Sequence, residues 1–369
     1  MGTTKQRSVN WDLLRSLAMF LVVVVHTPIS VGGELAWGSA NDWLVSRIIS
    51  TAAIICDPVF FTLSGYFALK PFTKDLKSYY LNKVSTIILP LILYSILLYF
   101  FMNRHDFATL SLEGYFSYFA SLLGGGWWFI PTLVPCLLVA PFLSKGLEHL
   151  SDKNIFVLCV LCMVMSGWGL CLDLVSWFGV QTGIETLSSF STMLSLLVPP
   201  GLLTIALNYF VFFILGGLFR RMAPHLHGRA GTAAIVVGLL FWLVDIMFLA
   251  FGFPRNDPSY CWMFATFGVM VLFDQLQIRA ELPSRIINWT AQRSYSIYLL
   301  QYTTIALSST AIYDYSLLGN VSAMNPALRV LMFVVYVLAA YLLALGIASV
   351  IDTLLLSNLQ KLFKRVIRE

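Results

Sequence analysis

Two ionisable side chains, Arg15 and His26, lie in one apolar stretch of the sequence, residues 11–31. They are eleven residues apart, so at about 100° per residue both fall on one face of a helix, roughly 16 Å apart along its axis. Ionisable groups are costly in hydrocarbon, and those inside a membrane span usually face a protein interior or a wet cavity. A neutral imidazole can remove a proton or attack an acyl group, and a guanidinium can bind a phosphate. The pair therefore predicts a functional site within the membrane.

Carboxylates near this pair allow both structural and functional interpretations. Asp12 lies three residues before Arg15, which permits an ion pair within the helix, although both side chains could instead reach the lipid headgroups. His26 alone is also compatible with a plain hydrogen bond between helices. Asp57, directly before Pro58, is a partner of His26, a ligand for a hydroxyl, or a satisfied group at a helix kink.

The composition indicates the class of protein. The chain is 59% hydrophobic and 11% charged, against about 25% charged residues in soluble domains. Apolar runs long enough to cross a bilayer recur along it. We therefore expect an all-α, polytopic membrane protein that forms one membrane-embedded domain over residues 1–369, without an appended soluble domain. Ten spans are expected near residues 11–31, 46–69, 84–102, 127–144, 155–173, 200–219, 231–252, 259–276, 288–308 and 329–353.

The distribution of basic residues predicts the orientation of these spans. With ten spans, eighteen of the 23 Lys and Arg residues fall on the side of the N-terminus and four on the other. By the positive-inside rule, both termini are then cytoplasmic. No basic patch alternates with aromatic residues, so the net charge of +5 indicates topology and not a nucleic-acid partner. The first apolar segment is too long for a secretory leader and is expected to stay as an anchor.

Other polar or reactive residues inside the spans are expected to be structural. Cys159 and Cys162 have a redox spacing, but they lie within a span and lack a second pair or a histidine, so the sequence predicts no metal site. Asp245, in the seventh expected span, is the weaker functional candidate among the carboxylates. Its most economical interpretation is a hydrogen-bonded structural group.

Four segments together resemble the acyltransferase-3 family of membrane O-acyltransferases. They are Arg15 and His26 with ten residues between them, the aromatic Ser-Gly segment 60–66, the Trp-Trp-Phe segment 127–129, and the Ser-x-x-x-Tyr-Leu segment 294–300. They occur in the family's order and along most of the chain. The resemblance implies transfer of an acetyl or other short acyl group from cytoplasmic acyl-CoA, a co-substrate and not a bound cofactor, to a hydroxyl at the outer face.

The resemblance also implies roles for individual residues at the donor side. It makes His26 the catalytic base or a transient acyl carrier, supported by Arg15 and Asp57. The anionic donor needs cations at the inner mouth of the site, where arginine suits phosphate best. The expected donor-binding residues are Arg15, Lys70, Lys74 and Lys77.

The acceptor side is described less fully by the sequence. The resemblance implies a cell-envelope polysaccharide or lipid-linked sugar, in a bacterial plasma membrane. The expected acceptor or pocket residues are Asp12, Ser64, Trp127, Trp128, Tyr298 and Gln301. The tryptophans are equally compatible with an interfacial aromatic belt, and Ser64 with Gly65 fits close packing of helices.

Residue 301 departs from the family pattern. Many members carry a histidine there, whereas this chain has Gln301. An amide donates and accepts hydrogen bonds but cannot act as a base at neutral pH, so we expect a binding or orienting role. A transporter or flippase for an anionic or sugar-linked substrate is the alternative function, although the sequence shows no paired halves of the kind such proteins often have.

Overall fold

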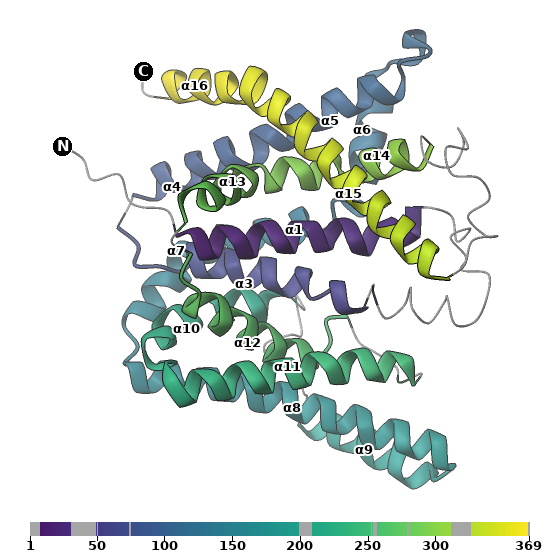
Figure 1. Cartoon of the computed structure of the whole chain (residues 1–369). Coiled ribbons are helices and arrows are strands. Elements are labelled where there is room, and N and C mark those ends of the chain that lie inside the picture. Colours follow the sequence, from purple (N-terminus) through teal and green to yellow (C-terminus); the bar gives the residue numbers. More distant parts are fainter. Residues whose placement is uncertain are drawn as a thin grey trace. The chain divides into compact units, whose positions relative to one another are not determined.

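The computed structural model describes residues 8–30, 49, 51–73, 75–198, 209–251, 253, 257–278, 280–310 and 326–367. Within these ranges the side chains of 28–30, 249–250 and 326–330 are not described. All regular elements in the described ranges are helices, which confirms the all-α prediction (Figure 1). Seven helices are long and apolar enough to cross a membrane: Val9–Thr27, Thr51–Ala68, Leu76–Met102, Phe129–Glu148, Asp152–Thr182, Gly228–Phe248 and Leu331–Val366.

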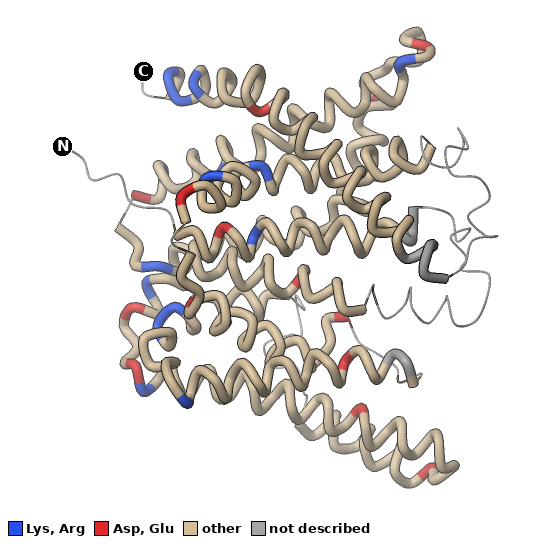
Figure 2. The backbone as a smooth tube through the Cα atoms, viewed as in Figure 1, with Lys and Arg blue, Asp and Glu red and all other residues tan. Residues whose placement is uncertain are grey.

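The remaining three expected spans stay predictions. The segment 200–219 lies partly outside the described residues and contains α10 (Phe210–Met222). The segment 259–276 is the apolar helix α12 (Cys261–Gln275), which has 15 residues. The segment 288–308 is divided between two helices, with a break at Arg293. Figure 2 shows that most Lys and Arg residues lie at helix ends and in connections, as expected for helices that cross hydrocarbon.

The chain folds into two compact units that are interleaved in sequence. Unit 1 comprises Met1–Leu21, Ala40–Phe72 and Val139–Ala280, and unit 2 comprises Val22–Ser39, Thr73–Leu138 and Glu281–Glu369. Two helices, α1 (Val9–Ser30) and α7 (Phe129–Glu148), are therefore divided between the units.

Unit 1 is packed through glycines. Its other elements are α3 (Cys56–Ala68), α8 (Asp152–Thr182), α9 (Glu185–Leu197), α10, η3 (Ala223–His225), α11 (Gly228–Ala250) and α12. The helix α10 packs on α3, and α11 packs on α12. A Cβ atom at Gly65 would lie 1.8 Å from the carbonyl oxygen of Phe213, and one at Gly216 would lie 2.0 Å from that of Thr62. Glycine at both positions lets the two backbones meet, as in many membrane helix pairs.

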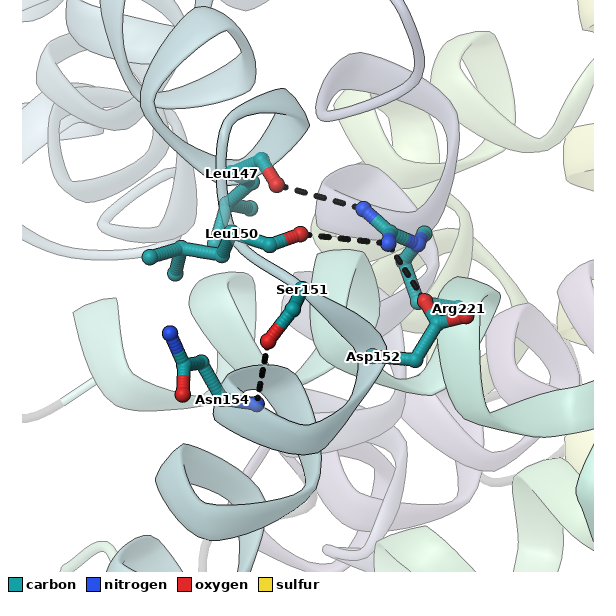
Figure 3. A network of polar contacts seen from close by, with 6 residues as sticks. All are labelled: Leu147, Leu150, Ser151, Asp152, Asn154 and Arg221. Atoms are coloured by element: carbon teal, nitrogen blue, oxygen red, sulfur yellow. Dashed lines mark hydrogen bonds and ion pairs between the residues drawn. The ribbon is translucent and has the colours of Figure 1, made fainter.

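One arginine in unit 1 joins three helix ends (Figure 3). Arg221, in the last turn of α10, donates to the carbonyl oxygens of Leu147 at 3.2 Å and Leu150 at 3.3 Å. It also pairs with Asp152 in the first turn of α8. The last carbonyl oxygens of a helix lack hydrogen-bond donors within the helix, and a guanidinium can donate to them. Arg221 therefore fixes the connection between α7 and α8 against α10.

Unit 2 contains two π-helical segments. Its elements are α4 (Leu76–Lys83), the π-helix η1 (Val84–Ile88), α5 (Leu89–Met102), η2 (Phe107–Thr109), α6 (Leu112–Gly124), α13 (Glu281–Gln292), α14 (Ser294–Ser309), α15 (Pro326–Ile351), the π-helix η6 (Asp352–Leu356) and α16 (Ser357–Val366). The Tyr295 hydroxyl donates to the carbonyl oxygen of Ile87 at 3.1 Å, and Gln360 Nε2 donates to that of Ser85 at 2.9 Å. Side chains from α14 and α16 thus bond to the backbone of η1, where the α-helical pattern is interrupted.

Candidate functional site

The helix α1 carries both residues of the predicted pair. It runs without a break from Val9 to Ser30, so Arg15 and His26 share one helix as expected. Asp12 lies in its first turn, where a carboxylate is favoured by the helix dipole. Its Oδ1 is 3.3 Å from an Arg15 guanidinium nitrogen, and Asp12 itself is 2% exposed. The predicted ion pair within the helix is confirmed, and the Arg15 guanidinium also lies 5.2 Å from the centre of the Phe67 ring.

His26 meets a tyrosine that the sequence did not single out. The Tyr302 hydroxyl is 2.8 Å from Nδ1 of His26 and 3.5 Å from Nε2, and both residues belong to unit 2. Both side chains are half-buried. A signal was present, because Tyr302 lies four residues after Tyr298 and so shares its helix face.

The turn before α7 packs on the same face of α14. Trp127 is 1% exposed, and its indole nitrogen donates to the carbonyl oxygen of Leu299 at 3.2 Å. The Tyr298 hydroxyl donates to the carbonyl oxygen of Gly126 at 3.1 Å. A Cβ atom at Gly126 would lie 2.5 Å from the Tyr302 ring, so any residue larger than glycine would displace that ring. The structure therefore brings predicted Trp127 and Tyr298 to the tyrosine that contacts His26.

The other two predicted pocket residues of unit 2 lie nearby in sequence. Trp128 is half-buried, and its ring lies edge-on to Phe129, at 6.3 Å between centroids. Gln301 is fully buried on α14, and neither its Oε1 nor its Nε2 has a hydrogen-bond partner among the described residues. Buried amides are nearly always bonded, because an unmet donor or acceptor costs about 1–3 kcal/mol. Gln301 thus offers a donor and an acceptor to a ligand or water.

The other predicted site residues of unit 1 lie on α3 and just beyond its end. Asp57, half-buried at the start of α3, accepts a hydrogen bond from the Cys56 thiol at 3.4 Å. Ser64 is half-buried in the same helix, and Lys70 is exposed beyond its end. In unit 2, Lys77 is exposed on α4, whereas Lys74 lies outside the described residues.

Two further carboxylates have hydrogen-bond partners within the fold. Asp245 is fully buried and accepts hydrogen bonds from Ser259 Oγ at 2.6 Å and from Trp262 Nε1 at 2.9 Å, which confirms the structural interpretation. Asp352, at the start of η6, accepts from Ser296 Oγ at 2.8 Å and from the Tyr94 hydroxyl at 2.8 Å. The sequence analysis missed this second cluster, which joins α5, α14 and η6.

Unit 1 also contains an apolar cavity of about 300 Å³. Side chains of α1, α3, α11 and α12 line it, and small residues such as Ala18, Ala265 and Gly268 leave its space open. Its lining offers hydrocarbon contact and no charged group. Unlike the surroundings of His26, its lining contains neither histidine nor tyrosine.

The fold and these sites are those of a helical membrane protein with an ionisable first helix. A family model described as an acyltransferase domain, that of the acyltransferase-3 family, matches residues 8–349 of the 369. The chain belongs to the acyltransferase-3 family. Comparison with curated proteins and with solved structures gave no significant match.

Proposed function

We propose that this membrane acyltransferase moves an acetyl or other short acyl group from cytoplasmic acyl-CoA to a hydroxyl of a cell-envelope polysaccharide or lipid-linked sugar at the outer face. The observation that carries the proposal is the hydrogen bond between His26 and Tyr302, because it orients an imidazole within the domain that the family model matches. The bacterial plasma membrane is the proposed location.

The hydrogen bond restricts which imidazole nitrogen reacts. Tyr302 lies on the Nδ1 side of His26. If Nδ1–H donates to the Tyr302 oxygen, Nε2 carries the lone pair and can act as a base, since a neutral imidazole carries one proton. In the opposite arrangement Tyr302 donates to Nδ1 and Nε2 carries the proton. The proposed chemistry requires the first arrangement.

The reaction then follows from one proton transfer in each direction. His26 Nε2 takes the proton of the acceptor hydroxyl as its oxygen attacks the carbonyl carbon of the thioester. The carbon–sulfur bond breaks, the thiolate of CoA leaves, and the imidazolium returns the proton to the sulfur. The products are the ester and free CoA. A route through an acyl group held on His26 would use the same nitrogen as a nucleophile.

The anionic donor is proposed to bind through cations. Arg15 is half-buried on α1, where its planar guanidinium suits a phosphate, and Lys70 and Lys77 are exposed near the ends of their helices. Lys74 belongs to the same basic segment of sequence. Asp12 holds the Arg15 guanidinium at 3.3 Å and so limits its orientations.

The acceptor is proposed to meet the face formed by α14 and the turn before α7. The unpartnered amide of Gln301 matches the donor and acceptor character of a sugar hydroxyl. Trp128 offers an apolar ring for a sugar face, and Tyr298 and Trp127 hold the turn in place. Asp57 and Ser64, on α3 of unit 1, remain proposed site residues.

The test is acyl transfer by the purified protein in proteoliposomes, with labelled acetyl-CoA and envelope glycan, and mass spectrometry of the glycan from cells. His26→Ala is expected to lower turnover by about 10²–10⁴-fold, the usual contribution of a general base. His26→Gln keeps much of the shape and should be equally inactive. Full activity of either variant contradicts the catalytic role, and substrate uptake without acyl turnover supports the transporter instead.

The two chemical routes are separable in the same preparation. A base never carries the acyl group, whereas a nucleophilic His26 forms an acyl-imidazole. Rapid acid quenching after mixing with labelled donor alone, followed by peptide mass spectrometry, detects that adduct if it forms. A labelled peptide containing His26 contradicts the base mechanism.

A further inference from the structure

The last helix of unit 2, α16, has one apolar and one basic face. At about 100° per residue, its apolar side chains fall within about 140° of its circumference and its polar ones occupy the opposite side. The apolar face consists of Leu359, Leu362, Phe363, Val366 and Ile367, and the polar face contains Gln360, Lys361, Lys364 and Arg365. Such a pattern is typical of helices at a membrane surface, with basic residues on one side and leucine or phenylalanine on the other.

The described part of the chain leaves Leu359, Leu362 and Val366 of the apolar face of α16 exposed, whereas Phe363 and Ile367 are half-buried. No residue of α16 is buried, and Leu359, Leu362 and Val366 are 36%, 58% and 64% exposed. Gln360, at the border between the two faces, holds the helix in place, because its Nε2 donates to the carbonyl oxygen of Ser85. The helix is therefore attached to unit 2 while its leucines stay outward.

The length of the last apolar segment places α16 near the headgroups. The segment Leu331–Val366 has 36 residues, about 54 Å of helix at about 1.5 Å per residue, whereas the hydrocarbon core is about 30 Å thick. About twenty residues cross that core, so a span that begins near Leu331 ends close to η6. The π-helix then separates the crossing part from α16.

The charge of α16 has one sign. Residues 357–367 contain three cations and no carboxylate, and Figure 2 shows cations on α16 close to the C-terminus. The nearest preceding acid, Asp352, accepts hydrogen bonds from Tyr94 and Ser296. A partner must therefore supply negative charge for one face and hydrocarbon for the other. Anionic phospholipids have both, and basic clusters beside a span attract them.

We propose that α16 binds anionic phospholipid, with Lys361, Lys364 and Arg365 on the headgroup phosphates and Leu359, Leu362 and Val366 against the acyl chains. This contact is independent of acyl transfer. It makes the C-terminal helix of unit 2 a lipid-selective surface.

Native mass spectrometry of the full-length protein, released from nanodiscs of phosphatidylcholine and phosphatidylglycerol, tests the headgroup contact. The variant combines Lys361→Gln, Lys364→Gln and Arg365→Gln. Each cation near an anionic surface contributes about 1 kcal/mol, or about fivefold. Retention of phosphatidylglycerol relative to phosphatidylcholine should therefore fall by about fivefold for each cation that contacts a phosphate.

A second triple variant controls for net charge. Lys145→Gln, Lys153→Gln and Arg229→Gln remove three exposed cations elsewhere in the chain. Selective loss of phosphatidylglycerol from the α16 variant supports the proposal. An equal loss in both variants, or no loss in either, overturns it. Because α16 buries no side chain, the variants should fold, and thermal unfolding in lipid-free detergent checks this.

A probe on the apolar face tests the hydrocarbon contact. Cys171 is the exposed cysteine among those described and the other five are buried, so Leu362→Cys is labelled with a fluorophore after Cys171→Ser. Quenching by phospholipids brominated on their acyl chains supports the proposal. Quenching by aqueous iodide, or protection from both quenchers as a covering protein would give, overturns it.

Discussion

The interior of each unit of this acyltransferase is stabilised by a different kind of contact. In unit 1, glycines bring helix backbones into contact, as Gly65 and Gly216 do between α3 and α10. In unit 2, aromatic side chains reach across to backbone carbonyls, as Trp127 and Tyr298 do between α14 and the turn before α7. Backbone contact tolerates no added atom, whereas a hydrogen-bonded side chain can move and react. The groups around His26 lie in unit 2, among side chains of the second kind.

The largest effect should come from enlarging a glycine of unit 1. Gly216→Val places a side chain about where the Thr62 carbonyl lies, 2.0 Å from the new Cβ. Backbone cannot yield as a side chain does, so the variant should lose about 3 kcal/mol or more of stability. The yield of folded protein and thermal unfolding in detergent measure this.

Gly146→Val is the matched control in the same unit, since nothing lies within 4 Å of a Cβ there. It should unfold near the wild-type temperature. Equal stability of the two variants would show that backbone contact is not what holds α3 to α10.

The next effect concerns chemistry in unit 2. Gly126→Ala puts a methyl group 2.5 Å from the Tyr302 ring, so the ring must shift and its hydrogen bond to His26 is disturbed. A misplaced catalytic group of this kind costs about 10²-fold in turnover, while the protein should still fold.

Tyr302→Phe should show a similar loss and a changed pH profile of kcat, because it removes the partner of Nδ1.

Gly124→Ala serves as the neutral comparison, because its added methyl group meets no atom within 4 Å. Turnover by this variant should match that of the wild type. If Gly126→Ala is as active as Gly124→Ala, the position of Tyr302 does not matter for transfer.

At Gln301 we expect a smaller effect, in which one substitution raises stability and weakens acceptor binding. Gln301→Leu removes two buried unpartnered polar atoms, so thermal stability should rise by about 1–3 kcal/mol. Acceptor KM should rise because the donor and acceptor groups are gone. A variant that is stabilised and equally active would contradict the binding role.

The smallest predicted effect concerns Arg15. Arg15→Lys keeps the charge but loses the planar fork that fits phosphate, and donor KM should rise about 3–10-fold with kcat little changed. Kinetics at varied acetyl-CoA concentration measure the split. A fall in kcat alone would place Arg15 in the chemical step instead.

The sequence predicted the features that depend on local pattern. Hydropathy was sufficient for the seven helices that are long and apolar enough to cross a membrane, and spacing was sufficient for the Asp12–Arg15 pair. The contact of His26 with Tyr302 joins residues 276 apart in sequence. The local sequence around a tyrosine in an apolar helix does not indicate which distant residue it contacts. The need for glycine at 126 arises from that distant ring as well.

The breaks and π-helical turns of the backbone also could not be predicted from the sequence. The expected span 288–308 is divided at Arg293, and neither π-helix was foreseen. A π-helical turn differs from an α-helical one by a small change in hydrogen bonding, which hydropathy does not record. Its stabilising partners, such as Tyr295 and Gln360, come from other helices.

The π-helix η1 sets the rotational phase of the helix that contains it. The segment Leu76–Met102 forms one continuous helical span of 27 residues, but the π-helix η1 divides it into α4 and α5. Each residue of an α-helix advances by about 100°. Deleting one residue within η1 would therefore turn Lys77 by about 100° around the axis relative to α5. The π-helix thus fixes the rotation about the helix axis between the basic helix α4 and the apolar helix α5.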